Sequence, residues 1–148
     1  MTQLAATNNF VLHPLLEAEL HLRAAQRAQD ISLIEPEVVP WRENDPETWV
    51  TPEIRRIEGE LASLAGDDVQ ALRLFDEAEA MAMRQGAARW RLRAALSSAD
   101  LELRRERPIA AAERLSPVLQ AFSADEIDED LQRAREIVAS AATVDIAR

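Results

Sequence analysis

Three residues near the start of the sequence have the types and spacing of metal ligands. His13, Glu17 and His21 follow one another at intervals of four residues, which places their side chains on one face of a helix. Pro14, however, puts His13 at or before the helix start, and no HExxH or ExxH pattern completes a site. We therefore interpret these side chains as solvated surface and expect no metal site.

A second candidate is the acidic run ADEIDED at residues 124–130. It lacks the alternating ligand spacing and the turn glycine of a calcium-binding EF-hand loop. Acids at the start of a helix are ordinary, because they face the positive end of the helix dipole. We interpret the run as a helix N-terminus, and we expect the protein to need no cofactor.

The sequence contains no catalytic motif that we can identify. It has no cysteine, which excludes disulfides, thiolate zinc sites and cysteine nucleophiles. It contains neither the GxSxG of a serine hydrolase nor the GxxxxGK[ST] of a phosphate-binding loop, and its 3 glycines could not form the latter. We therefore expect that the protein is not an enzyme.

Composition and charge narrow the classes of partner. Apolar residues make up 47% and charged residues 30% of the chain, which is typical of one globular domain over residues 1–148. The formal net charge of −10 should repel a nucleic acid. No run approaches the roughly 20 apolar residues that span a bilayer, and the first residues lack a signal-peptide pattern. We expect a cytoplasmic protein that binds neither nucleic acid nor membrane.

Strong helix formers dominate the chain and predict an all-α fold of about six helices. Ala, Leu, Glu and Arg are abundant, whereas Tyr is absent and aromatics amount to 4%. Residues 1–9 are polar and are expected to be disordered, and residues 14–31 carry apolar side chains at helical spacing. Four prolines then interrupt residues 31–52, where we predict a long loop, because proline lacks the amide that a helix needs.

Caps and breaks predict five further helices, at residues 52–65, 68–85, 88–105, 108–122 and 123–140. Thr51, Pro52 and Glu53 are typical of a helix start, and a glycine follows each of the next two helices. Short breaks favour antiparallel neighbours. We therefore predict two helix pairs over residues 53–122, followed by a terminal helix.

Capping boxes mark two of these starts. Asp67 is followed three residues later by Gln70, and Ser123 is followed in the same way by Glu126. The helix predicted at residues 88–105 carries apolar side chains on several sides, which indicates packing on several sides. We therefore expect it to be the central helix and its aromatic residue, Trp90, to lie in the core.

Two sets of small and apolar residues recur along the predicted helices. Gly59, Ala71, Phe75 and Ala78 form the first set, in which small residues let paired helices approach and the aromatic fills the gap toward the next pair. This pattern resembles the tetratricopeptide repeat, and the resemblance implies antiparallel helix-pair repeats. A weaker copy follows after forty residues, whereas the repeat usually has a period of about 34. The copy consists of Ala99, Ala111, Leu115 and Val118.

A wider resemblance covers residues 53–139. It lies in EIRRIEGELASLAGD, ALRLFDEAEAMAMRQGA, LRAALSSADLELRRE and AAAERLSPVLQAFSADEIDEDLQRAREIV, which are similar to the C-terminal repeats of large bacterial signalling ATPases. The resemblance implies a protein–protein interaction module that acts as a regulatory or assembly partner in bacterial signalling. Two alternatives stay open. One is a small-molecule sensor that holds its ligand between the proline-rich loop and the helices, and the other is a detached segment of a larger ATPase-type regulator.

The tetratricopeptide resemblance also implies a partner-binding groove lined by the first helix of each pair. The candidate residues are Glu53, Arg56, Glu60, Ser63, Arg93, Leu96, Asp100 and Leu103. The alternative is that some of them face a neighbouring helix or a second subunit, since a homodimer would cover exposed apolar faces.

Two tryptophans in the proline-rich loop offer a different site. Trp41 and Trp49 either anchor a partner, because Trp is enriched at binding hot spots, or pin the loop onto the helices.

Overall fold

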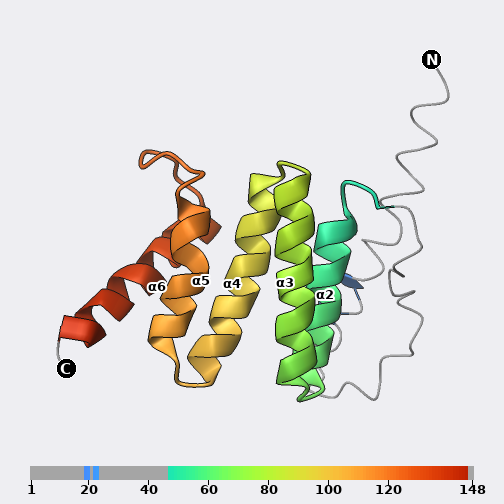
Figure 1. Cartoon of the computed structure of the whole chain (residues 1–148), viewed down its shortest axis with the longest axis horizontal. Helices are drawn as coiled ribbons and strands as arrows, with labels where there is room; N and C mark the ends of the chain where they lie inside the picture. The colour runs from blue at the N-terminus through green and yellow to red at the C-terminus, as the bar shows by residue number, and fades with distance from the viewer. Residues whose placement is uncertain (1–18, 21, 24–46, 147–148) are drawn as a thin grey trace.

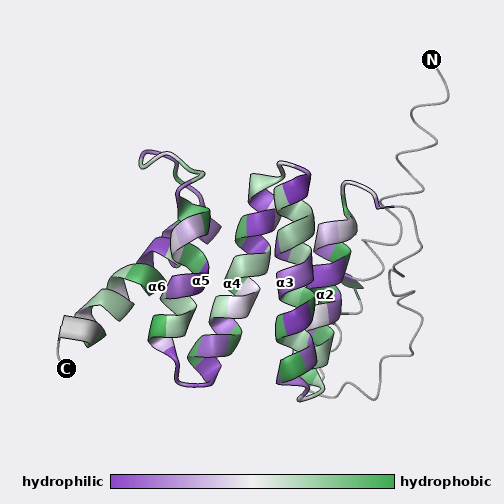
Figure 2. Ribbon diagram, viewed as in Figure 1, coloured by the Kyte–Doolittle hydropathy of each residue, from purple (hydrophilic) through white to green (hydrophobic). Residues whose placement is uncertain are grey.

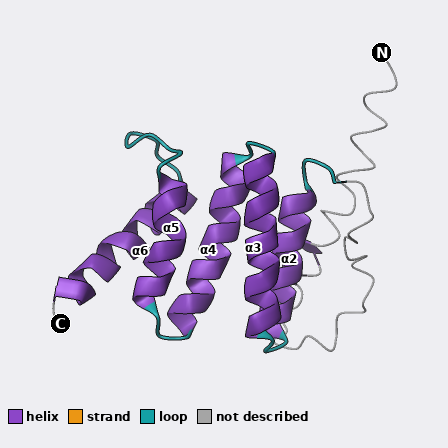
Figure 3. Cartoon of the chain, viewed as in Figure 1, coloured by secondary structure: helices purple, strands orange, loops and turns teal. Residues whose placement is uncertain are grey.

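The computed structural model describes residues 19, 20, 22, 23 and 47–146 of the chain. This part contains helices and loops but no strand (Figure 3), so the predicted all-α class is confirmed. Its helices are α2 (Thr51–Leu64), α3 (Asp68–Arg84), α4 (Ala88–Arg104), α5 (Pro108–Leu119) and α6 (Glu129–Ile146). Residues 19, 20, 22 and 23 are helical as well. The predictions for residues 1–9, for His13, Glu17 and His21, and for Trp41 lie outside the described residues.

Successive helices run up and down, and α4 occupies the middle of the array (Figure 1). It packs against α3 and α5, its neighbours in the chain, and also against α2 and α6. Hydrophilic and hydrophobic residues are interspersed along every helix (Figure 2), as expected where only some faces are buried. The central position predicted for residues 88–105 is confirmed. Trp90 is only half-buried, in contrast to the core position that we predicted.

One turn geometry joins the first four of these helices. Gly66, Gly86 and Glu106 follow α2, α3 and α4 at intervals of twenty residues, with φ of 83°, 66° and 59°. After each of them, the next amide donates to the carbonyl five residues back, as in Asp67 to Ala62 at 2.9 Å. Equivalent turns of successive helix pairs are therefore forty residues apart, which explains why the second sequence copy follows after forty residues.

The predicted small residues form a tight seam between α2 and α3. An alanine Cβ built at Gly59 would lie 2.5 Å from Cε1 of Phe75, so only glycine fits against the ring. Ala71, Phe75 and Ala78 are fully buried. The second set, Ala99, Ala111, Leu115 and Val118, is fully buried too. The seam fits the packing that we expected from the sequence, while membership of the tetratricopeptide family stays a prediction.

The last two helices depart from their predicted bounds. The α5 helix ends at Leu119 rather than at residue 122, and Pro117 lies in its last turn. Because proline has no amide and its ring crowds the carbonyl four residues earlier, Pro117 weakens the last turn of α5. The α6 helix begins at Glu129 rather than at residue 123.

The late start of α6 has a local cause. The amide of Ser123 donates to the Glu126 carboxylate at 2.9 Å, which is one half of the predicted capping box. The Ser123 hydroxyl, however, donates to Asp125 instead of accepting from the chain ahead. Asp128 is the actual cap, since its Oδ1 accepts from the amides of Asp130 at 3.0 Å and Leu131 at 3.2 Å.

Replacing Gly59 with alanine should lower the free energy of unfolding by about 1–3 kcal/mol, because the new methyl group would overpack the seam. Phe75 is fully buried and cannot swing aside. This loss outweighs the roughly 1 kcal/mol by which alanine is favoured over glycine inside a helix. Urea denaturation measures the change. In a Phe75→Leu background the same substitution should cost less, and equal losses in the two backgrounds would disprove the contact.

Replacing Glu106 with glycine should raise the free energy of unfolding by about 1 kcal/mol. Glu106 has a left-handed backbone with φ of 59°, which glycine adopts without the strain that a Cβ introduces. Thermal denaturation at fixed protein concentration provides the measurement. Gly86→Ala is the matched control at the equivalent turn and should destabilise by a similar amount. A loss of stability in Glu106→Gly would contradict the strain.

Candidate protein-interaction surface

A buried network of charged groups joins α2 to α4. Arg56 of α2 is only 7% exposed, and its Nη2 and Nε donate to the two carboxylate oxygens of Glu53 at 2.7 and 3.0 Å. Its Nη1 lies 3.3 Å from Oε1 of Glu60 and donates to the hydroxyl of Ser97 on α4, also at 3.3 Å. Ser97 in turn donates to Glu60 at 2.6 Å. A single guanidinium therefore makes contacts along α2 and across to α4.

The surroundings of Arg56 keep its side chain positively charged. Burial by itself would lower the pKa of Arg56, but the hydrogen bonds and the charge of Glu53 raise it, with smaller contributions from Glu60 and Glu19. The net effect is a pKa above the ordinary value for arginine. Bidentate pairing of this kind is the strongest form of arginine–carboxylate contact, which suits a group that has lost its water.

The network continues to the surface through Arg93 of α4. Arg93 Nη1 lies 2.8 Å from Oε1 of Glu53, and its guanidinium carbon sits 5.6 Å from the ring centre of Trp90. Trp90 stacks on Trp49, with ring centroids 6.4 Å apart and an angle of 25° between the planes. Trp49 comes just before α2 and is 51% exposed. We call Trp49, Trp90 and Arg93 the Trp–Arg surface.

The Trp–Arg surface connects two sites that the sequence offers as alternatives, the predicted groove and the loop tryptophans. Arg93 belongs to the predicted groove, and Trp49 belongs to the predicted loop anchors. The stack on Trp90 pins Trp49 to α4, as one of the two interpretations expected, yet about half of the Trp49 side chain is still open to solvent. Pinning and exposure are therefore compatible, and the two candidate sites adjoin each other.

The groove residues differ in how far they can be reached. Glu53, Arg56 and Leu96 are buried, so the alternative in which some of them face a neighbouring helix describes these three. The others reach the surface in part or fully: Glu60, Ser63, Arg93, Asp100 and Leu103.

Like Glu60 and Arg93, two further reachable groove residues bind side chains of other helices. The hydroxyl of Ser63 accepts from Arg104 of α4 at 2.8 Å, and Asp100 pairs with Arg133 of α6. Polar contacts thus link α2 to α4 and α4 to α6 along one side of the array.

An N-terminal residue covers part of α2. Leu22 is 5% exposed and packs against Ile57 and Leu61. Glu19, three residues before it, contributes to the electrostatic stabilisation of Arg56. The spacing of residues 14–31 predicts an apolar helical face that includes Leu22, but the sequence does not say which helix that face covers.

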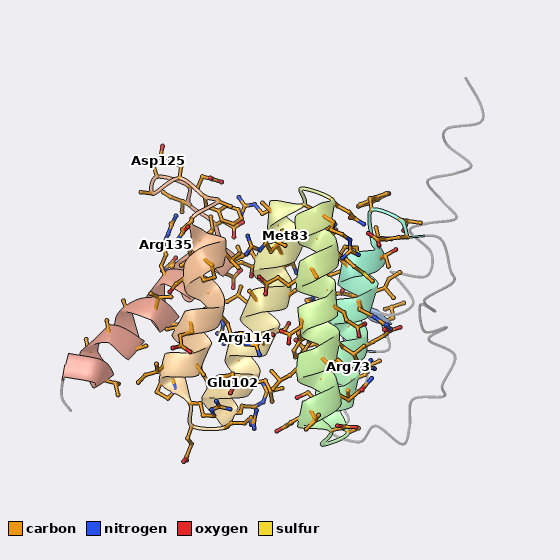
Figure 4. All side chains as sticks on the ribbon, in the orientation of Figure 1. Arg73, Met83, Glu102, Arg114, Asp125 and Arg135 are labelled. Atoms are coloured by element: carbon orange, nitrogen blue, oxygen red, sulfur yellow. The ribbon has the colours of Figure 1, made fainter. Side chains whose placement is uncertain are left out.

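Two polar residues that the sequence did not single out make buried contacts in the structure. Ser97 completes the link between α2 and α4, and the signal for it is a pair of serines within the otherwise apolar stretch AALSSA at residues 94–99. Glu102 is buried at the end of α4 (Figure 4), with one carboxylate oxygen 3.3 Å from Arg107 and 3.7 Å from Arg105. The positive charges of Arg105 and Arg107, in the turn after α4, therefore compensate the buried carboxylate of Glu102.

Metal sites and membrane spans can be examined directly in the described residues. Among them, no three acidic or histidine side chains are grouped so that they could hold a metal ion. Within the same part of the chain, no helix has the length and apolar character to cross a membrane. Comparison with protein-family models, with curated proteins and with solved structures returns no match. The resemblances noted in the sequence therefore stay predictions.

Replacing Arg56 with methionine should lower the free energy of unfolding by about 3–5 kcal/mol, because it leaves the buried Glu53 carboxylate without its main partner. The double variant Glu53→Gln/Arg56→Met should be more stable than Arg56→Met alone, since no buried charge is left over. Arg73→Met is the matched control, because Arg73 is exposed and such surface pairs contribute about 0–1 kcal/mol. Equal losses of unfolding free energy in Arg56→Met and Arg73→Met would show that the buried network stabilises the protein no more than a surface ion pair does.

Proposed function

We propose that this chain is a non-catalytic protein-interaction module that binds a partner protein through the Trp–Arg surface. The observation that carries the proposal is the half-exposed Trp49 side chain, held in place by the stack on Trp90. Trp and Arg are the residue types most enriched at interface hot spots, and here they adjoin on one surface. An aromatic ring that is fixed before binding loses little conformational freedom when a partner covers it.

The neighbouring groove residues extend this surface and give it specificity. Glu60, Ser63, Asp100 and Leu103 combine acidic, polar and apolar groups on α2 and α4. Charged groups of this kind orient a partner and discriminate among partners more than they add affinity. Arg56 and Glu53 are buried beneath this surface and stabilise it, because they hold α2 and α4 together.

The biological setting of the proposal rests on the sequence resemblance. The repeat segment of bacterial signalling ATPases is a scaffold, and residues 53–139 of this chain resemble that segment. A regulatory or assembly partner in bacterial signalling is therefore the role that we propose. The small-molecule sensor would use the proline-rich loop, most of which lies outside the described residues.

Substituting Trp49 and Arg93 should abolish partner capture without unfolding the protein. The test uses wild type, Trp49→Ala, Arg93→Gln and Val69→Ala as baits in an extract of the native host, with mass spectrometry of the bound proteins. We expect one partner on wild type and Val69→Ala that is missing from the other two baits. With that partner purified, Trp49→Ala should weaken binding by about thirtyfold, equivalent to about 2 kcal/mol.

Val69→Ala is the control because Val69 is also an exposed apolar residue, on α3 and outside the Trp–Arg surface. Circular dichroism should show the same helix content in all four proteins. Trp49→Ala also loses its aromatic stack, so a fall in stability of about 1 kcal/mol is expected. A partner that binds all four baits equally would refute the assignment of the surface.

A further inference from the structure

A different surface lies on α5 and α6, at the opposite end of the array from α2 (Figure 1). The two helices diverge toward the C-terminal end of α6, and two hollows of about 340 and 440 Å³ lie there. Both hollows are lined by Ile109 and Glu113, so they adjoin each other along α5. We call it the α5–α6 groove.

The floor of the α5–α6 groove is mostly apolar and consists mainly of small side chains. On α5 it contains Ile109 and Ala112, with Ser116 one helical turn further on. On α6 it contains Val138, Ala141 and Ala142. Val138 packs on the core that α4, α5 and α6 share, so the floor is anchored. Small residues on facing helices let the backbone of a further helix approach closely, which is how a helix fits into an apolar groove.

The rim of the α5–α6 groove is acidic. Glu106 and Glu113 are exposed, and neither side chain forms an ion pair or hydrogen bond within the part of the chain that the structure describes. Arg107 is the cation that lines the same hollow, and its guanidinium already lies 3.3 Å from the buried carboxylate of Glu102. Two uncompensated carboxylates therefore stand beside an apolar floor.

We propose that the α5–α6 groove binds an amphipathic helix with a basic flank, supplied by a partner protein. The apolar face of that helix would cover Ala112, Val138 and Ala141, and Lys or Arg side chains beside it would pair with Glu106 and Glu113. The net charge of −10 attracts a basic segment and speeds its association. This site is separate from the Trp–Arg surface, so the module would hold two different segments at once.

The test measures binding of a labelled amphipathic peptide by fluorescence anisotropy. The probe is a peptide of about five helical turns with Leu and Ala on one face and Lys on the other, and its control has Glu in place of Lys. We expect the Lys peptide to bind the wild-type protein with a Kd in the micromolar range and the Glu peptide to bind at least about tenfold more weakly.

Protein variants separate the groove from general attraction between opposite charges. Glu106→Gln/Glu113→Gln should weaken binding of the Lys peptide by at least about tenfold. Asp68→Asn/Glu129→Gln removes the same number of negative charges at positions outside the groove and should leave the Kd of the Lys peptide within about twofold. Ala112→Trp should fill the floor and prevent binding while circular dichroism shows an intact helix content. The comparison of the two double variants stands even where Ala112→Trp fails to fold.

Three outcomes would overturn the groove. They are equal weakening by both double variants, equal binding of the Lys and Glu peptides, and no binding of either peptide. Trp49→Ala should bind the Lys peptide like wild type, so failure of the groove and failure of the Trp–Arg surface are distinguishable.

Discussion

A buried guanidinium determines how the helices of this protein stack. Arg56 lies in the contact between α2 and α4, where burial alone would disfavour its charge, and the carboxylate of Glu53 holds it there as a cation. Arg56 and Glu53 both lie on α2, and their contacts with Ser97 and Arg93 of α4 join the two helices. Arg93 also lies near the ring of Trp90 on its own helix, and Trp49 stacks on that ring, so the contacts extend from Arg56 to Trp49.

Helix bounds could be predicted wherever a signal within one turn decides them. The caps and glycines of residues 51–108 place the ends of α2, α3 and α4 within one residue of the structure. Asp67 accepts from the amide of Gln70 at 3.0 Å, as the capping box predicted. The central place of α4 was predictable too, because a helix that is apolar on several sides needs neighbours on several sides.

The rest of the fold and most of the candidate site depend on contacts between distant segments. The sequence allows Arg56 and Glu53 either to line the groove or to face a neighbouring helix, and their burial depends on pairing along α2 and on Ser97 of α4. No local pattern shows that Trp49 meets Trp90. The wrong prediction for the start of α6 has a different origin. The Ser123 hydroxyl could cap a helix or bind Asp125, the sequence allows both equally, and in the structure it binds Asp125.

The repetition of one turn geometry gives this array a route to change its length through gene duplication. Gly66 and Glu106 share a left-handed backbone, and the residues that follow them start α3 and α5 in similar conformations. A duplicated unit cut at these two joints would enter and leave the array with the same backbone path, so its helices would continue the stack. The loop after α5 offers no such joint, because Arg135 holds it through the carbonyls of Ser123 and Glu126. Helix pairs can thus be inserted between α2 and α5, whereas the α5–α6 loop does not allow such an insertion.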